Sequence, residues 1–149
     1  MTKDDDGTPA SSELKWFRRA CWVYASVPIV LGSSIALSGG AGLQRWFGFD
    51  LANPDPSLES ALHFLAANFA AMGLVLVWAT RDVVPRRAAM RIVFGAMVVG
   101  ATLRLMSIAV HGVPSMMTMA VIGGELSAGG LWLWHTRVLR QLHRANAVP

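Results

Sequence analysis

The chain has 149 residues, of which 54% are hydrophobic and only 15% are charged, and its formal net charge is +4. This composition departs from that of an average soluble domain and predicts a membrane protein with a single domain. With one cysteine, Cys21, the sequence excludes an internal disulfide, a CxxC redox motif and a cysteine-based metal site.

Four apolar segments of spanning length follow one another along the chain. They cover about residues 20–37, 61–79, 88–110 and 116–134. Each is close to the roughly 20 residues that a helix needs to cross a bilayer. The sequence therefore predicts an all-α fold, an integral membrane four-helix bundle within residues 15–140.

Polar segments flank and connect these predicted spans. Residues 1–14 predict a disordered tail, and residues 141–149 a second short tail. The long connection is the outer loop of residues 39–60. Its centre, LQRWFGF, is aromatic and amphipathic and predicts a segment at the membrane interface, with a lid over a site as the alternative.

Basic residues gather on one side of the predicted membrane, and only Arg45 lies on the other. By the positive-inside rule we expect both termini in the cytoplasm and the chain in the inner (cytoplasmic) membrane. The bases lie where anionic lipid head groups attract them, so the net charge requires no nucleic-acid partner. The basic residues expected inside are Lys3, Lys15, Arg18, Arg19, Arg81, Arg86, Arg87, Arg91, Arg137, Arg140 and Arg144.

Two charged residues lie inside the predicted spans, Arg104 in the third and Glu125 in the fourth. Arg104 lies ten residues before Pro114 and Glu125 ten after Ser115, so the two are level in an antiparallel hairpin. With roughly 1.5 Å of rise per residue, both are about 10 to 15 Å below the outer helix ends. Unpaired, each costs at least about 2.5 to 3.5 kcal/mol, so we expect a buried ion pair that faces the bundle interior.

Further polar residues lie at helical spacing from this pair. Ser107 and His111 follow the arginine on the third span, and Thr118 precedes the glutamate on the fourth. Asn68 has the same expected depth on the second span. We expect these four residues to face inward as candidate ligand-binding residues, with the ion pair itself as the candidate catalytic element.

Small residues predict where the helices approach one another closely. The candidates are Ala67 and Ala71 on the second span, Ala96 and Gly100 on the third, and the run GGELSAGG on the fourth. The glycines on either side of Glu125 allow two interpretations, tight packing against the third helix or a cavity beside the carboxylate.

No metal site and no cofactor is expected. The histidines lie near the ends of the spans, away from the positions of axial haem ligands. His63, His111 and Glu125 lie at different depths and carry no zinc-binding signature.

The intramembrane Arg104, the HGVPS turn, Glu125 and the second-span sequence LHFLAANFAAMGL together resemble a family of small bacterial four-helix membrane proteins classed as a domain of unknown function. The resemblance covers about residues 17–140 and is carried mainly by Arg104, Gly112, Pro114 and Glu125. It implies an architecture rather than an activity. More distantly, the plan is similar to sterol-isomerase and sigma-type ligand-binding bundles, in architecture alone.

Two functions from different classes fit these residues. In the first, the ion pair lines a site, reached from the outer leaflet, for a small lipid-soluble ligand or substrate, and an enzymatic role stays open. In the second, the chain is a structural or accessory membrane subunit whose pair only clamps the hairpin of the third and fourth helices. The expected partners are the lipid bilayer, a small hydrophobic ligand and further copies of the chain. A cavity beside Glu125 favours the first function, and dry packing the second.

Overall fold

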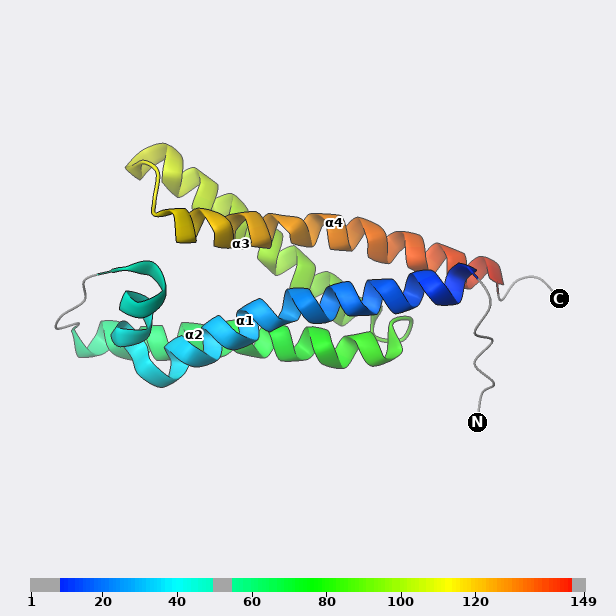
Figure 1. Cartoon of the computed structure of the whole chain (residues 1–149), viewed down its shortest axis with the longest axis horizontal. Helices are drawn as coiled ribbons and strands as arrows, with labels where there is room; N and C mark the ends of the chain where they lie inside the picture. Colours follow the sequence, from blue (N-terminus) through cyan, green and yellow to red (C-terminus); the bar gives the residue numbers. More distant parts are fainter. Residues whose placement is uncertain (1–8, 50–54, 146–149) are drawn as a thin grey trace.

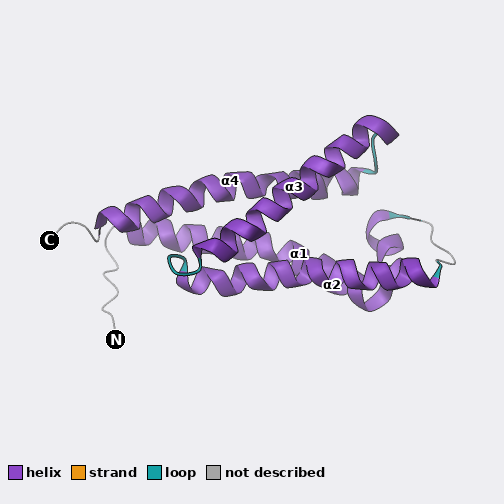
Figure 2. Ribbon diagram, turned by 180° about the vertical axis from the view of Figure 1, so that it is seen from behind, coloured by secondary structure: helices purple, strands orange, loops and turns teal. Residues whose placement is uncertain are grey.

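The fold is built from helices alone. The computed structural model describes residues 9–49 and 55–145, and this part of the chain contains four long helices, one short 3-10 helix and no strand (Figures 1 and 2). The predicted all-α fold is confirmed. The elements are α1 (Pro9–Phe47), α2 (Pro56–Ala79), η1 (Thr80–Asp82), α3 (Arg87–His111) and α4 (Met116–Ala145).

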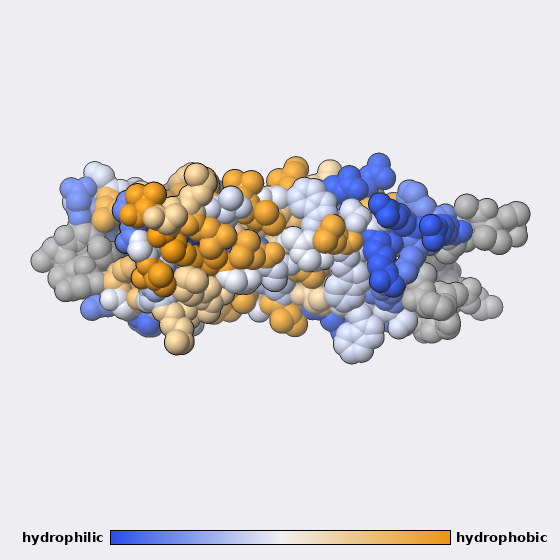
Figure 3. Space-filling model, turned by 90° about the horizontal axis from the view of Figure 1, so that it is seen from above, coloured by the Kyte–Doolittle hydropathy of each residue, from blue (hydrophilic) through white to orange (hydrophobic). Residues whose placement is uncertain are grey.

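All four long helices have the length and the apolar composition to cross a membrane. Large hydrophobic side chains cover the outside of the bundle, and Val23, Leu37 and Leu133 are 72%, 85% and 73% exposed. Figure 3 shows this apolar surface beside a strongly hydrophilic end of the molecule. A surface of this kind is stable in lipid rather than in water, so the chain is a multi-pass membrane protein.

The first turns of α1, the α2–α3 connection and the last turns of α4 lie at the same end of the bundle (Figure 1). We call it the basic end, because most of the arginines are there. Arg18 Nη2 donates to the carbonyl oxygen of Arg81 at 3.1 Å, and Arg137 Nε lies 3.1 Å from Glu13 Oε1. We call the opposite end, which holds the α3–α4 connection, the turn end.

Helices α1 and α2 pack closely through small residues. A side chain at Gly32 of α1 would lie 2.6 Å from Ala70 N and 2.7 Å from Ala66 O, so the two backbones nearly touch there. Ala66 and Ala70 are buried, whereas Ala67 and Ala71 are exposed. The prediction that Ala67 and Ala71 form the close contact was wrong, because α2 is rotated by one residue relative to the expected face.

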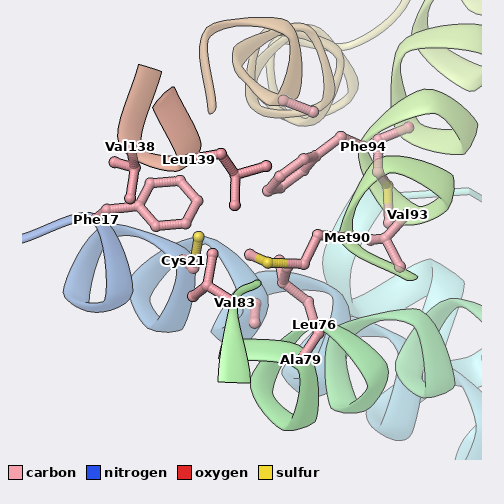
Figure 4. Packing of buried hydrophobic residues seen from close by; sticks show 13 residues of the cluster. Phe17, Cys21, Leu76, Ala79, Val83, Met90, Val93, Phe94, Val138 and Leu139 are labelled. Atoms are coloured by element: carbon pink, nitrogen blue, oxygen red, sulfur yellow. The ribbon is translucent and has the colours of Figure 1, made fainter. Parts of the chain in front are cut away.

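A hydrophobic cluster near the basic end joins all four helices (Figure 4). Its members include Phe17 and Cys21 of α1, Leu76 of α2 and Phe94 of α3, each fully buried. His135 of α4 is also fully buried, with its ring stacked on Phe17 at 5.7 Å between centroids. The cluster holds the basic end together, and Cys21 serves in it as a small apolar side chain.

Helix α1 is longer than its predicted span and bends sharply at Gly39. There φ is 53° and ψ is −131°, a conformation that favours glycine. Residues 40–47, predicted as part of a loop, form a short helix that leaves the axis of α1 (Figure 1). Both carboxylate oxygens of Glu59 accept from the N–H of Gly40, the residue after the bend, at 3.0 and 3.1 Å. Trp46 Nε1 donates to Ser34 Oγ at 2.9 Å, so both ends of the short helix are fixed.

The helices also extend into both predicted tails. α1 begins at Pro9 and α4 ends at Ala145, so helix replaces the nearer part of each tail. Residues 1–8 and 146–149 lie outside the described residues, as do residues 50–54 of the predicted loop.

Helix α2 begins at a polar cap. The Asp55 side chain accepts a hydrogen bond from Ser57 N at 2.8 Å, and Pro56 occupies the first helical position. Hydrogen bonds from Ser57 lower the pKa of the Asp55 carboxyl, since they stabilise its charged form. The cap and the proline together start helix α2 at this point.

Helices α3 and α4 form a hairpin that diverges from α1 and α2. The hairpin turns at Gly112, where φ is 92°. Ala101 of α3 is fully buried, but no residue of α3 beyond it is buried. The turn end of α3 accordingly lies away from α1 and α2 (Figure 1).

Candidate functional site

Arg104 of α3 and Glu125 of α4 contact each other. The distance from Arg104 Nε to Glu125 Oε2 is 3.3 Å, so the equal spacing from the turn correctly placed the two residues level. The Glu125 side chain is 8% exposed, but that of Arg104 is 48% exposed. The expectation that both face the interior holds for Glu125 alone, because the divergence of α3 leaves Arg104 half outside.

One oxygen of the Glu125 carboxylate accepts no hydrogen bond from the described residues. This oxygen, Oε2, is buried without a hydrogen bond, although Arg104 Nε is only 3.3 Å away. The two observations are compatible, because a hydrogen bond requires the Arg104 N–H bond to point at the Glu125 oxygen, whereas the attraction between the opposite charges does not. A buried acceptor is thereby left available to another group.

A cavity of about 240 Å³ adjoins this carboxylate. We call it the Glu125 cavity. All four helices line it, and apart from Glu125 its walls are mainly apolar and aromatic. Tyr24 and Pro28 come from α1, Phe69 from α2 and Met97 from α3.

A second cavity, of about 370 Å³, adjoins Arg104. We call it the Arg104 cavity. It shares Leu31, Phe69 and Val121 with the Glu125 cavity, so the two spaces are neighbours between the hairpins. Phe47 of the short helix also lines it. The ion pair therefore joins two apolar spaces, with an acceptor in one and a donor in the other.

The glycines beside Glu125 leave space rather than bring helices together. A side chain added at Gly123, Gly124 or Gly130 would meet no neighbouring atom within 4 Å, and the same holds for Gly100 of α3. Gly124 itself lines the Glu125 cavity. Gly123 and Gly130 are exposed and do not line it, and a side chain at Gly129 would lie 3.8 Å from Val98 of α3.

Of the other candidate residues, Ser107, His111 and Thr118 line a further cavity of about 310 Å³ together with Arg104, whereas Asn68 lies apart from it. Asn68 is exposed, and its Nδ2 donates to the carbonyl oxygen of Phe64 on the same helix at 2.7 Å. Ser107 and His111 are exposed near the end of α3, where the backbone carbonyl of Ser107 lies 3.1 Å from His111 Nδ1. Only Thr118 is buried, and it lines the Arg104 cavity. The expected burial fails for three of the four residues, because helix rotation exposes Asn68 and the divergence of α3 exposes Ser107 and His111.

The sequence reasoning missed several residues that line the cavities. Tyr24 is the chain's one tyrosine and lies four residues before Pro28. Because proline has no N–H, the backbone carbonyl of Tyr24 lacks its usual helical donor, and this spacing could have drawn attention to the residue. Leu43 and Phe47, in the segment LQRWFGF, line the Arg104 cavity. Their placement agrees with the lid interpretation of that segment, and its position at the membrane interface stays a prediction.

The described residues contain no group of three histidine, cysteine, aspartate or glutamate side chains that could hold a metal ion. His63 instead contacts Ala36 of α1, near the bend at Gly39, and Glu59 of α2. Its Nδ1 lies 2.7 Å from the carbonyl oxygen of Ala36, and its Nε2 lies 3.4 Å from Glu59 Oε1.

Comparison with known proteins gives one match. The family described as "Domain of unknown function (DUF4345)" matches residues 16–136, which is most of the chain and includes both residues of the ion pair. No curated protein and no solved structure matches the chain.

Proposed function

This chain belongs to the family of the domain of unknown function DUF4345, and we propose that it binds a small lipid-soluble ligand in the cavities between its two helical hairpins. One observation carries the proposal: the buried carboxylate of Glu125 adjoins an apolar cavity, and its Oε2 atom accepts no hydrogen bond from the described residues. Ligand sites are mostly apolar with a few convergent polar groups, and this arrangement has that character.

The volumes support a ligand rather than a clamp. A pair that only locks the α3–α4 hairpin needs no space beside it, and dry packing around Glu125 would be the natural arrangement. The Arg104 cavity of about 370 Å³ is instead in the range of small-molecule sites, and the Glu125 cavity of about 240 Å³ adds a smaller space beside it. The accessory-subunit alternative has no comparable observation in its favour.

Access from the outer leaflet follows from the distribution of charge. The basic end carries the arginines of α1, the α2–α3 connection and α4, and by the positive-inside rule it faces the cytoplasm. The Arg104 cavity lies toward the other end, beside Phe49, which is 49% exposed, and Leu65, which is 62% exposed. A lipid-soluble molecule in the outer leaflet would meet these side chains first.

The role of the ion pair is to orient the polar part of the ligand. Glu125 offers an acceptor and Arg104 offers donors, because a guanidinium has five N–H groups and the contact with Glu125 is made by Nε at 3.3 Å. Proton transfer by Glu125 is the catalytic form of the same role, and it requires a ligand atom within hydrogen-bond distance of the carboxylate.

Cavity filling tests the proposal. Val121 lines both cavities, whereas Leu126 on the same helix is 43% exposed on its outer face. We expect native mass spectrometry of the gently solubilised protein to detect a retained small molecule, which Val121→Trp abolishes and the matched control Leu126→Trp keeps. Equal retention in both variants, or no retained molecule in the wild type, contradicts the proposal.

Labelling from each side tests the orientation. A Cys21→Ala chain that carries Ser57→Cys has its one cysteine at the start of α2, where Ser57 is exposed. We expect an impermeant thiol reagent to label it from outside intact cells. Labelling from the cytoplasmic side alone would invert the topology and the assigned access route, without touching the cavity.

A further inference from the structure

We propose that the head group recognised at this site is an uncharged hydroxyl, so that the ligand is a neutral lipid alcohol with an apolar tail. The inference rests on the proposed function and names the chemistry of its ligand. It follows from three properties of the two cavities: which hydrogen-bonding groups lack a partner, how the charge is balanced, and where the apolar surface continues.

The Glu125 cavity presents an acceptor that receives no hydrogen bond. Glu125 Oε2 is buried and accepts no hydrogen bond. Pro28 has no N–H, so the carbonyl of Tyr24, one turn earlier, cannot receive its usual helical hydrogen bond. Tyr24, Pro28 and Glu125 all line this cavity. An acceptor without a donor is unfavourable in an apolar medium, so the cavity favours a ligand that donates.

The charge of the site is already balanced. Glu125 and Arg104 neutralise each other across 3.3 Å, and no other described charged residue lines either cavity. An ammonium group on the ligand would add a positive charge beside this neutral pair, and a carboxylate a negative one. Either would give the site a net charge within the span, so an uncharged head group is favoured.

A hydroxyl satisfies both requirements with one group. Its O–H donates to Glu125, and its oxygen accepts from a donor such as the phenol of Tyr24. A ketone, an ester or an ether only accepts, and would leave the Glu125 oxygen without a donor. A charged amine donates but brings an unbalanced charge.

The tail of such a molecule has apolar side chains to pack against. Leu31, Phe69 and Val121 line both cavities, so a chain that starts at Glu125 lies against the side chains that also border the Arg104 cavity. Leu43 and Phe47 of the short helix cover the far side of that space. The site thus fits a slender amphiphile whose polar end lies deepest.

Four matched probes test the inference on the full chain in lipid nanodiscs. Each carries the same alkyl chain with a diazirine for photocrosslinking, and the heads are a hydroxyl, its methyl ether, a primary amine and a carboxylic acid. Labelled residues are located by mass spectrometry. We expect the alcohol to label cavity residues about tenfold more than the ether, the factor that a hydrogen bond to a charged acceptor provides, and more than the amine or the acid.

The outcomes separate this inference from the proposed function. Equal labelling by alcohol and ether, or a preference for the amine or the acid, overturns the alcohol assignment while lipid-soluble binding stands. If no probe labels residues such as Phe69 or Val121, both proposals fail. The wild-type comparison needs no variant, so a folding defect cannot obscure it.

Two double variants then assign the preference to the ion pair. In Arg104→Met/Glu125→Leu we expect the alcohol to label no better than the ether, with the ether unchanged. Arg86→Met/Asp82→Leu removes an ion pair of 2.7 Å near the basic end and should keep the tenfold preference. A preference that survives the first double variant refutes recognition by Glu125.

Discussion

Replacing Arg104 by methionine removes the ion-pair partner of Glu125 and leaves a carboxylate that is 8% exposed among apolar side chains. Breaking a buried pair in this way costs about 3–5 kcal/mol, because the remaining charge stays desolvated. Replacing Glu125 by leucine leaves Arg104, whose side chain is 48% exposed and can turn toward polar surroundings. That loss should cost less, about 1–3 kcal/mol. We therefore expect Arg104→Met to be the more damaging single change.

The double variant should recover most of the loss. With both charges replaced by apolar side chains of similar volume, no desolvated charge remains, and stability should return to within about 1 kcal/mol of the wild type. The coupling energy between the two sites is then at least about 2 kcal/mol. For a chain of this size, the Arg104→Met loss corresponds to a fall in melting temperature on the order of 10 °C.

Thermal unfolding in detergent, followed by tryptophan fluorescence, measures the four proteins of this cycle. The control is the same cycle on Arg86 and Asp82, an ion pair whose side chains are 25% and 53% exposed and whose coupling should stay below about 1 kcal/mol. Additive effects of Arg104→Met and Glu125→Leu, within about 0.5 kcal/mol, would refute the pairing. A larger loss from Glu125→Leu would refute the assignment of Glu125 as the more buried partner.

Glycine substitutions test the packing and the kink by the same measurement. Gly32→Ala should destabilise the chain by about 1–3 kcal/mol because the added carbon meets the backbone of α2, whereas Gly123→Ala meets nothing and should be neutral or stabilising. Gly39→Ala should cost more than Gly48→Ala, since both have positive φ but only Gly39 faces a carboxylate. With Trp46 as the sole tryptophan, lipids with shallow quenchers should quench it more than aqueous iodide does; the reverse would place its segment in solvent.

The sequence determined the number of helices, their approximate spans and the pairing of Arg104 with Glu125. Segment length and hydropathy are local properties, so they are readable without tertiary contacts. The ion pair was readable for a second reason: a short turn fixes the register of an antiparallel hairpin, and equal spacing from Pro114 and Ser115 then makes two residues level.

Only the tertiary structure decided which face of each helix turns inward. In a membrane, lipid and protein interior are equally apolar, so hydrophobic periodicity does not mark the buried face as it does in water. Asn68 and Ala67 were therefore assigned to the wrong side of α2, whereas Ser107 lines a cavity with Arg104 and Thr118 but is exposed rather than buried. The kink at Gly39 could not be predicted from the local sequence either, because it depends on Glu59, twenty residues later in the chain.

The cavities could not be predicted from the sequence. The glycines beside Glu125 permit close packing or empty space equally, and the choice depends on how far the two hairpins diverge. That divergence is set by packing at the basic end, where Phe17 and Phe94 hold the helices together, and by its absence beyond Ala101. Local sequence determines each helix, whereas the space between the helices depends on how all four pack together.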